Sequence, residues 1–165
     1  MRQPDQEFVL LRHGDAAMAP HGADATRPLT NHGRAQAHAI AQRLRWYDCG
    51  FDEAWVSPLT RTRETAAIVL AVHRDPVGLH FDQRLAPSAS ASEIAALVAG
   101  WAQQPTGLRL IVAHQPTLAL LACALLGVPH IAPMARAQAL RISNGVLRWR
   151  FSHGADAPMR GSSNA

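Results

Sequence analysis

The 165-residue sequence contains no lysine, only two cysteines and few charged residues. Its charged fraction of 17% lies below the usual value of about 25%, whereas its hydrophobic fraction of 48% is ample for a buried core. These proportions exclude wholesale disorder and collagen-like repetition. Cys49 and Cys123 are too few for a disulfide framework and lack the spacing of metal ligands, so we expect both to be reduced thiols.

Long hydrophobic runs are also absent. No apolar stretch approaches the roughly 20 residues of a membrane-spanning helix, and the polar segment Met1–Glu7 carries no apolar signal core. We therefore expect a cytoplasmic protein that does not bind a membrane. At this length we expect a single domain over residues 7–152, with flexible termini at residues 1–6 and 153–165.

All 16 basic residues are arginines, and the formal net charge is +4. Arginine binds phosphate through a planar fork of N–H donors, whereas lysine offers a point charge. The same bias can come from the base composition of a genome. The composition therefore permits an anionic partner without requiring one.

Short apolar runs alternate along the chain with segments of helical periodicity. Strands are predicted at residues 8–11, 54–56, 77–81 and 108–113, helices at 31–47, 59–73, after Ser92 and at 117–126, and a hairpin at 139–143 and 146–152. Thr30 is a good N-cap for the first helix, Gly127 ends the last one, and Asn144-Gly145 is a strong two-residue turn. The alternation predicts an α/β fold, a three-layer sandwich with a mostly parallel central sheet, helices on both faces and a C-terminal β-hairpin.

Polar residues directly follow three of the predicted strands. Arg12 and His13 come after the first strand, Ser57 leads from the second strand to Arg61, and His114 follows the fourth. The carboxyl ends of parallel strands meet at one edge of a sheet, where α/β proteins bind their ligands. We therefore expect these side chains to converge.

Two arginines and two histidines suit a tetrahedral anion such as a phosphoryl group. Arginine forks bind its oxygens in pairs, and a neutral imidazole is a competent nucleophile toward phosphorus at neutral pH. Gly14, directly after His13, lets the backbone approach such a ligand closely because it has no Cβ. No pair of acidic residues lies nearby to hold magnesium, so we expect neither a metal nor another cofactor.

These motifs resemble those of a known family. Leu11-Arg12-His13-Gly14 resembles the RHG signature of the histidine phosphatase superfamily, which includes the phosphoglycerate mutases. The extension to Asp15-Ala16, with Arg27-Pro28-Leu29-Thr30 and Gly33, is most similar to its SixA-like phosphohistidine phosphatases. Later segments are similar to two further family blocks: Val56-Ser57-Pro58 before Arg61, and Val112-Ala113-His114-Gln115-Pro116. The similarity covers about residues 7–152, with the blocks in the same order.

The resemblance implies a phosphoglycerate mutase-like fold and a role for each matching residue. His13 would be the nucleophile that is transiently phosphorylated, Arg12 and Arg61 would clamp the phosphoryl oxygens, and His114 would stabilise the transferring group. Three further residues would contact the substrate: Gly14, Arg27 and Ser57. The implied partner is a phosphorylated substrate, and we expect a phosphohistidine-bearing signalling protein.

One departure from the family concerns the proton donor. Phosphomonoesterases of the superfamily usually carry an acid after the third strand. This sequence offers only Asp82 and Glu93 there, and Glu93 is typical of a first helical turn. Gln115 stands where phytase-like members carry another acid. An alkoxide leaves poorly without a proton donor, whereas a phosphorylated imidazole protonated on its other nitrogen leaves as a neutral ring. The missing acid therefore favours a P–N substrate.

Three alternatives stay open at this point. A small-molecule phosphomonoesterase for sugar or nucleotide phosphates would need Asp82 or Glu93 as its acid. A non-catalytic phosphate-binding module would keep the pocket without turnover. Nucleic-acid binding is less favoured, because Arg148 and Arg150 alternate with apolar and aromatic residues as in a half-buried strand, so the aromatics point the other way.

Overall fold

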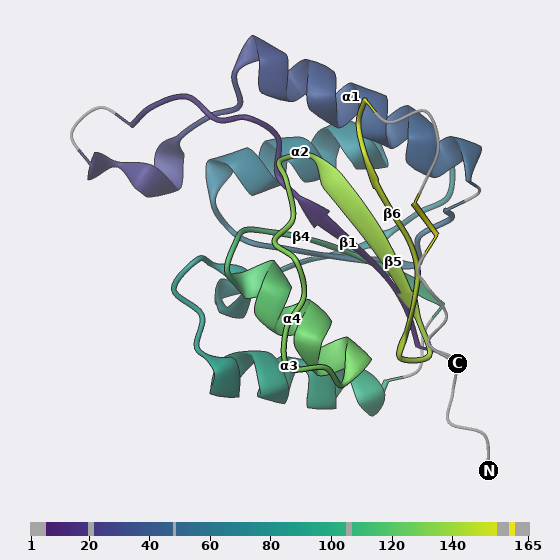
Figure 1. Ribbon diagram of the computed structural model, residues 1–165. Coiled ribbons are helices and arrows are strands. Elements are labelled where there is room, and N and C mark those ends of the chain that lie inside the picture. The colour runs from purple at the N-terminus through teal and green to yellow at the C-terminus, as the bar shows by residue number, and fades with distance from the viewer. Residues whose placement is uncertain (1–5, 20–21, 48, 105–106, 155–158, 161–165) are drawn as a thin grey trace.

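The computed structural model describes residues 6–19, 22–47, 49–104, 107–154 and 159–160. In these ranges a seven-stranded sheet is covered by two helices on each face, α1 and α2 on one and α3 and α4 on the other (Figure 1). The strands are β1 (Glu7–Arg12), β2 (Glu53–Val56), β3 (Gly78–Phe81), β4 (Leu108–Ala113), β5 (Gln138–Ser143), β6 (Val146–Ser152) and β7 (Met159–Arg160). The helices are α1 (Asn31–Trp46), α2 (Thr60–Leu70), α3 (Ala91–Ala102) and α4 (Thr117–Leu126), with short 3₁₀ helices η2 (Asp24–Thr26) and η3 (Gln83–Leu85). The predicted three-layer α/β architecture is confirmed.

The strand order in the sheet is β3-β2-β4-β1-β5-β6-β7. The pairs among β3, β2, β4 and β1 are parallel, whereas β5, β6 and β7 add to the sheet in antiparallel fashion. Leu11 of β1 and Val56 of β2 both pair with Val112 of β4, so the carboxyl ends of these three strands lie level. The residues that follow the three strands therefore meet at one edge of the sheet.

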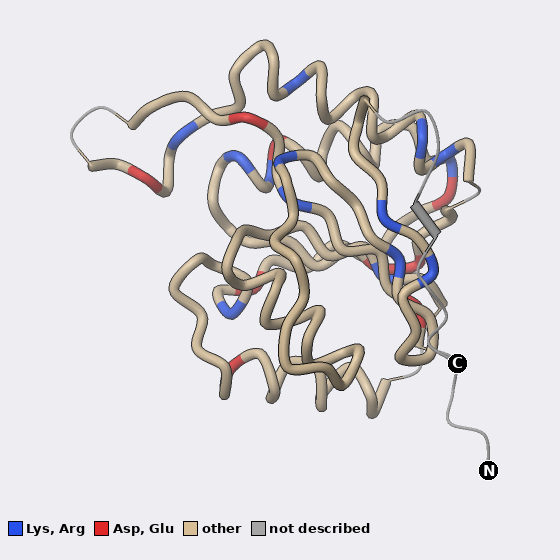
Figure 2. Tube along the Cα trace, in the orientation of Figure 1, with Lys and Arg blue, Asp and Glu red and all other residues tan. Residues whose placement is uncertain are grey.

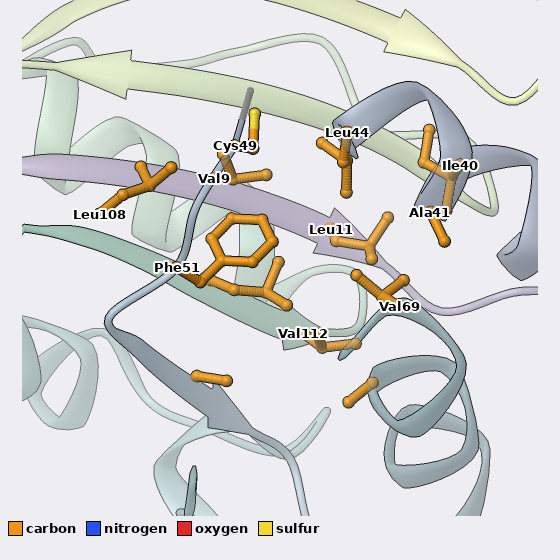
Figure 3. Close-up of a cluster of buried hydrophobic side chains, with 14 of the residues drawn as sticks. Val9, Leu11, Ile40, Ala41, Leu44, Cys49, Phe51, Val69, Leu108 and Val112 are labelled. Atoms are coloured by element: carbon orange, nitrogen blue, oxygen red, sulfur yellow. The ribbon is translucent and has the colours of Figure 1, made fainter. Parts of the chain in front are cut away.

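The middle of β1 is a continuous apolar run because its alternate residues enter different layers of the core. Val9 and Leu11 of β1 pack with Ile40 of α1 on one face of the sheet (Figure 3). Phe8 of the same strand packs on the other face against Trp101 of α3, with ring centroids 5.5 Å apart. A strand buried on both faces reads as a continuous hydrophobic run, as the sequence does here.

Side-chain caps set the starts of α1 and α3. Thr30 accepts a hydrogen bond at 2.9 Å from the backbone N–H three residues on and caps α1, as predicted. The predicted start of α3 after Ser92 is wrong, because the helix begins at Ala91. Ser90 and Glu93 form a reciprocal capping box that satisfies two backbone N–H groups at once, which favours the earlier start.

The predicted ends of elements agree with the structure to within one residue, except at α2. This helix ends at Leu70 rather than near residue 73, and the chain continues as a turn in which the His73 N–H donates to the Leu70 oxygen at 3.0 Å. Gly127 ends α4 in the left-handed region, with φ of 66°. Asn144 and Gly145 have φ of 50° and 74°, as the predicted two-residue hairpin turn requires.

The segments expected to be flexible, residues 1–6 and 153–165, lie largely outside the described residues. Within the second segment, Met159–Arg160 form β7 and pair with β6. None of the helices in the described ranges combines the length and hydropathy that a membrane span requires.

Candidate active site

A cavity of about 280 Å³ lies where β1, β2 and β4 end. Its lining consists of Arg12, His13, Ala16, Asp24, Arg27, Arg61, Pro87, His114, Gln115 and Arg136. Five of the residues predicted for the site line this one cavity: Arg12, His13, Arg27, Arg61 and His114. Gly14 and Ser57 do not line it but contact residues that do. The topology thus brings together side chains from distant parts of the sequence.

His13 follows β1 and is almost buried, with 7% of its surface exposed. Its Nδ1 lies 2.7 Å from the Gly14 carbonyl oxygen. A carbonyl oxygen only accepts hydrogen bonds, so Nδ1 carries the proton and Nε2 keeps a free lone pair. Burial lowers the pKa of His13 to about 4, assisted by the positive charges of Arg61 and Arg12 and opposed by the bond to Gly14. At neutral pH the ring is therefore neutral and has one nucleophilic nitrogen.

His114 follows β4, and its ring centroid lies 5.0 Å from that of His13. The pKa of His114 is lowered to about 3, mainly by burial and then by the proximity of His13 and Arg61. Its Nε2 lies 2.8 Å from Oγ of Ser57, a fully buried residue just after β2. Ser57 therefore contacts the His114 ring and is not among the residues that line the cavity.

Arg12 and Arg61 bring two guanidinium groups to the cavity. Arg12 donates through Nη1 to the Met134 carbonyl oxygen at 2.7 Å, which ties the end of β1 to the segment before β5. Arg61, in the first turn of α2, is 5% exposed and donates to the main-chain oxygen of Asp24 at 2.8 Å and to its Oδ2 at 3.1 Å. In both arginines Nε is buried and has no hydrogen-bond partner among the described residues. Such atoms are uncommon in folded proteins and accord with a site built for a polar ligand.

Two charged residues of the cavity, Asp24 and Arg136, are not predicted from the sequence. Asp24 begins η2, and its Oδ1 accepts a hydrogen bond from Nη1 of Arg27 at 3.0 Å. The hydrogen bond from Arg27, followed by that from Arg61, holds the pKa of Asp24 below its usual value. Arg136, before β5, is paired with the carboxylate of Asp15. The sequence signal for Asp24 is only its position three residues before Arg27, and Arg136 belongs to no motif.

Gly14 packs against the start of α1, which gives this glycine a structural reason that the sequence did not indicate. A Cβ at position 14 would lie 2.5 Å from the main-chain oxygen of Gly33, far inside contact distance. Its N–H donates to Oγ1 of Thr65 at 3.2 Å, and its carbonyl oxygen accepts from His13. The contact between two backbone segments thus requires the absence of a side chain at position 14.

Neither of the two acids considered as proton donors lines the cavity. Asp82 accepts a hydrogen bond from Nη2 of Arg84 at 2.6 Å, and the bonds from Arg84 hold the pKa of Asp82 below its usual value. Glu93 is held by Ser90 in the capping box of α3, which lowers the pKa of Glu93. Both groups are therefore ionised carboxylates that are engaged elsewhere.

The cavity lining combines four guanidinium groups with one carboxylate and two neutral imidazoles. Arginine forks bind the oxygens of a tetrahedral anion, and the free imidazole nitrogen offers a nucleophile. Across the described part of the chain, no three histidine, cysteine, aspartate or glutamate side chains are grouped so as to hold a metal ion. The arrangement therefore suits the transfer of a phosphoryl group.

Comparisons with known proteins agree with this chemistry. The family model of the histidine phosphatase superfamily (branch 1) matches residues 8–88. An uncharacterised protein of Picosynechococcus sp. is 37% identical over 113 residues, which is 68% of this chain and 68% of that protein. The structure of the protein histidine phosphatase SixA complexed with tungstate has a TM-score of 0.82 at 22% identity, and the match covers 90% of this chain and 97% of that one. A mycobacterial glucosyl-3-phosphoglycerate phosphatase has a TM-score of 0.65 at 20% identity, covering 84% of this chain and 90% of that one.

Fold and cavity together define a phosphatase, an enzyme that removes a phosphoryl group from its substrate by hydrolysis. The chain belongs to the histidine phosphatase superfamily, branch 1. The family match contains Arg12, His13 and Arg61, and the structural match extends the likeness over the rest of the sheet. The phosphoglycerate mutase-like fold predicted from the motifs is confirmed.

Proposed function

We propose that this phosphatase hydrolyses phosphohistidine in a protein, through a phosphohistidine intermediate on its own His13. One observation carries the proposal. The cavity holds a buried neutral imidazole with a free Nε2 among guanidinium groups, and its single carboxylic acid, Asp24, is held in the ionised form. The site therefore has a nucleophile and a phosphoryl clamp, but no side-chain carboxylic acid to protonate a leaving alkoxide.

In the first step the Nε2 lone pair of His13 bonds to phosphorus while the bond from phosphorus to the substrate's ring nitrogen breaks. The departing ring keeps that electron pair and leaves as a neutral imidazole, because its other nitrogen already carries a proton. Arg12 and Arg61 neutralise the phosphoryl oxygens, and His114 completes the pocket around them. The transition state is loose, so positioning and charge supply most of the catalysis.

In the second step a water oxygen bonds to phosphorus and the bond to Nε2 of His13 breaks. Both protons of the water stay on the released phosphate, and the ring of His13 returns to its neutral form. While it is phosphorylated, this ring carries a positive charge, and the hydrogen bond from Nδ1 to the Gly14 oxygen stabilises that charge. The same bond fixes which nitrogen is free to react.

The test is a trapping experiment with a peptide that carries labelled phosphohistidine. We expect rapid quenching to trap acid-labile label on the wild-type protein and none on His13→Ala. The matched control is His38→Ala, which removes an exposed histidine from α1 and is expected to label normally. Full labelling or full turnover by His13→Ala would show that another residue is the nucleophile.

A second candidate is a phosphatase for small phosphate esters, which the similarity to a glucosyl-3-phosphoglycerate phosphatase supports. A turnover panel of phosphohistidine peptide, phosphoramidate, sugar phosphates and p-nitrophenyl phosphate, with and without chelator, distinguishes the two. We expect the highest kcat/KM on the P–N compounds and no effect of the chelator. Faster hydrolysis of a sugar phosphate would favour the second candidate. Tight binding of phosphopeptide without phosphate release would indicate a non-catalytic module.

A further inference from the structure

We propose that Asp24 makes the site selective for a phosphorylated imidazole, by accepting a hydrogen bond from the protonated ring of the substrate. The inference rests on the proposed function and deepens it. Asp24 is the residue that distinguishes a P–N substrate from a phosphate ester, and His13 stays the nucleophile.

Asp24 lies on the side of the cavity toward which a leaving group departs. In-line attack by Nε2 of His13 places the leaving group on the far side of phosphorus. His13 is 7% exposed, whereas the Asp24 side chain is 55% exposed and lines the same cavity. The carboxylate is therefore at the open end of the cavity, and the nucleophile is at its closed end.

Binding of a phosphoryl group frees one carboxylate oxygen of Asp24. Arg61 holds Oδ2 of Asp24 at 3.1 Å, and the phosphoryl oxygens compete for the same guanidinium group. Oδ1 is held separately by Arg27 at 3.0 Å, so the carboxylate stays in place when Arg61 exchanges partners. Oδ2 then has no guanidinium partner and is free to accept an N–H from the substrate.

The surroundings of Asp24 keep its carboxylate an acceptor. The charged and titratable groups that share the cavity with it are Arg27, Arg61, Arg12, Arg136, His13 and His114. The arginines are cationic, and both histidines are neutral at neutral pH because burial lowers the pKa of His13 to about 4 and that of His114 to about 3. Hydrogen bonds from Arg27 and then Arg61 keep the pKa of Asp24 below its usual value. Asp24 therefore offers negative charge and no proton.

A phosphorylated imidazole can use such a group, whereas a simple aryl phosphate cannot. A phosphorylated imidazole protonated on its distal nitrogen presents a cationic N–H, and a charge-assisted hydrogen bond to a carboxylate stabilises it. The carboxylate repels the phosphoryl dianion of either substrate, but p-nitrophenyl phosphate has no N–H on its leaving group with which to offset that repulsion. Asp24 thus favours the first substrate and disfavours the second.

The experiment compares Asp24→Asn with wild type on a phosphohistidine peptide and on p-nitrophenyl phosphate, since neither leaving group needs an external acid. We expect kcat/KM on the peptide to fall about 10-fold or more, the usual effect of losing a hydrogen bond between charged groups. We expect kcat/KM on p-nitrophenyl phosphate to stay the same or rise. Asp82→Asn removes an arginine-paired carboxylate outside the cavity and is expected to change neither value.

The pH profile of kcat gives a second readout. A carboxylate beside the bound ring raises the ring's pKa, so wild type should keep its turnover of the peptide to higher pH. In Asp24→Asn we expect the alkaline limb of this profile to move down by about one pH unit. The profile on p-nitrophenyl phosphate, which has no such ring, should not move. Asp24→Glu keeps the charge and is expected to restore part of the preference for the peptide.

The outcomes separate this inference from the function on which it rests. Equal losses on both substrates in Asp24→Asn, with an unshifted pH profile, would mean that Asp24 merely positions Arg61, and the inference would be wrong. A wild-type enzyme that hydrolyses p-nitrophenyl phosphate but not the peptide would overturn the proposed function, and the inference with it.

Discussion

At the scale of single residues, the two histidines of the cavity differ from exposed histidines mainly through burial. His13 is 7% exposed and His114 is 2% exposed, and in both cases burial is the largest cause of the lowered pKa. Their hydrogen bonds differ. His13 uses Nδ1 toward Gly14 and keeps Nε2 free, whereas His114 uses Nε2 toward Ser57. The first ring thus keeps a free nitrogen for the proposed attack on phosphorus, and the second is held beside it by Ser57.

Replacement of Arg61 by lysine tests the proposed phosphoryl clamp. Arg61 presents Nη1 and Nη2 as a planar pair of donors, and lysine offers only a point charge that cannot bind two oxygens in the same geometry. We expect kcat/KM of Arg61→Lys to fall about 10²-fold or more, as when one donor to a transition-state oxygen is lost. The control is Arg84→Lys, which alters an arginine–aspartate pair outside the cavity. An Arg61→Lys enzyme as active as this control would remove Arg61 from the clamp.

At the scale of elements, the loop after β1 is fixed by close contact with the first turn of α1. A Cβ at Gly33 would lie 2.0 Å from the Asp15 main-chain oxygen, and a Cβ at Gly14 would lie 2.5 Å from the Gly33 oxygen. Thr30, the N-cap of α1, also donates to Oδ2 of Asp15 at 2.9 Å. The helix start therefore sets the path of the residues that follow His13.

Substitution of Gly33 by alanine should disturb this contact. The added methyl group meets backbone rather than a flexible side chain, so we expect a loss of stability of about 1–3 kcal/mol together with lower activity. The matched control is Gly100→Ala in α3, where no atom lies within 4 Å of the new Cβ. In a helix that change is expected to raise stability by about 0.5–1 kcal/mol. Urea unfolding measures the stability of both variants. A Gly33→Ala protein as stable as wild type would show that the loop tolerates the methyl group.

The elements that could be predicted from the sequence are those with a local signal. Thr30 before α1, Gly127 after α4 and the Asn144-Gly145 turn each act through their own backbone, so the sequence is sufficient to find them. The start of α3 is different, because alternating serines precede it and Ser90 is selected over Ser92 by its reciprocal pairing with Glu93. The position of the N-cap depends on which serine, together with a glutamate three residues later, satisfies more backbone N–H groups. The preference of serine for N-cap positions does not by itself distinguish the two serines.

At the scale of the whole molecule, the arginines are unevenly distributed. Figure 2 shows charged positions along α1 and α2, in the loop after β1 and along the strands at the right of the view, but only sparsely over α3 and α4. The amino-acid composition does not show which arginines line the cavity and which are buried within the sheet. Arg109 is 1% exposed and pairs with Glu53 at 2.8 Å within the sheet, whereas Arg61 reaches the cavity.

The part of the cavity that could be predicted follows from the topology of the sheet. Arg12 is the last residue of β1, and His13 and His114 directly follow β1 and β4, so the parallel arrangement alone brings them to one edge. Asp24 and Arg136 come from loops, and their positions depend on ion pairs with residues far along the chain. Such pairs are set by the folded structure as a whole, and no periodicity or spacing in the sequence indicates them.

Burial of two neutral histidines makes the stability of the whole molecule depend on pH. The pKa of His13 is about 4 and that of His114 about 3 in the folded protein, against about 6.5 in an unfolded chain. Below about pH 6.5 the unfolded state therefore binds more protons than the folded state, and the free energy of unfolding falls with decreasing pH. Each ring contributes up to about 1.4 kcal/mol per pH unit until its folded pKa is reached. Well above pH 6.5 both states hold neutral rings, and this contribution vanishes.

Urea unfolding between about pH 5 and pH 7.5, in buffers without phosphate because a bound anion would itself stabilise the fold, measures this slope. Glutamine does not titrate, so in His13→Gln we expect the dependence of the unfolding free energy on pH to be weaker than in wild type by about the contribution of one histidine ring. This expectation holds whatever the stability of the variant at neutral pH. His38→Ala, which removes an exposed histidine, serves as the control and should keep the wild-type slope. If His13→Gln and wild type lose stability in parallel on acidification, the ring of His13 takes up its proton without unfolding. The cavity would then hold an imidazolium in mild acid, and the neutral nucleophile on which the chemistry depends would be confined to higher pH.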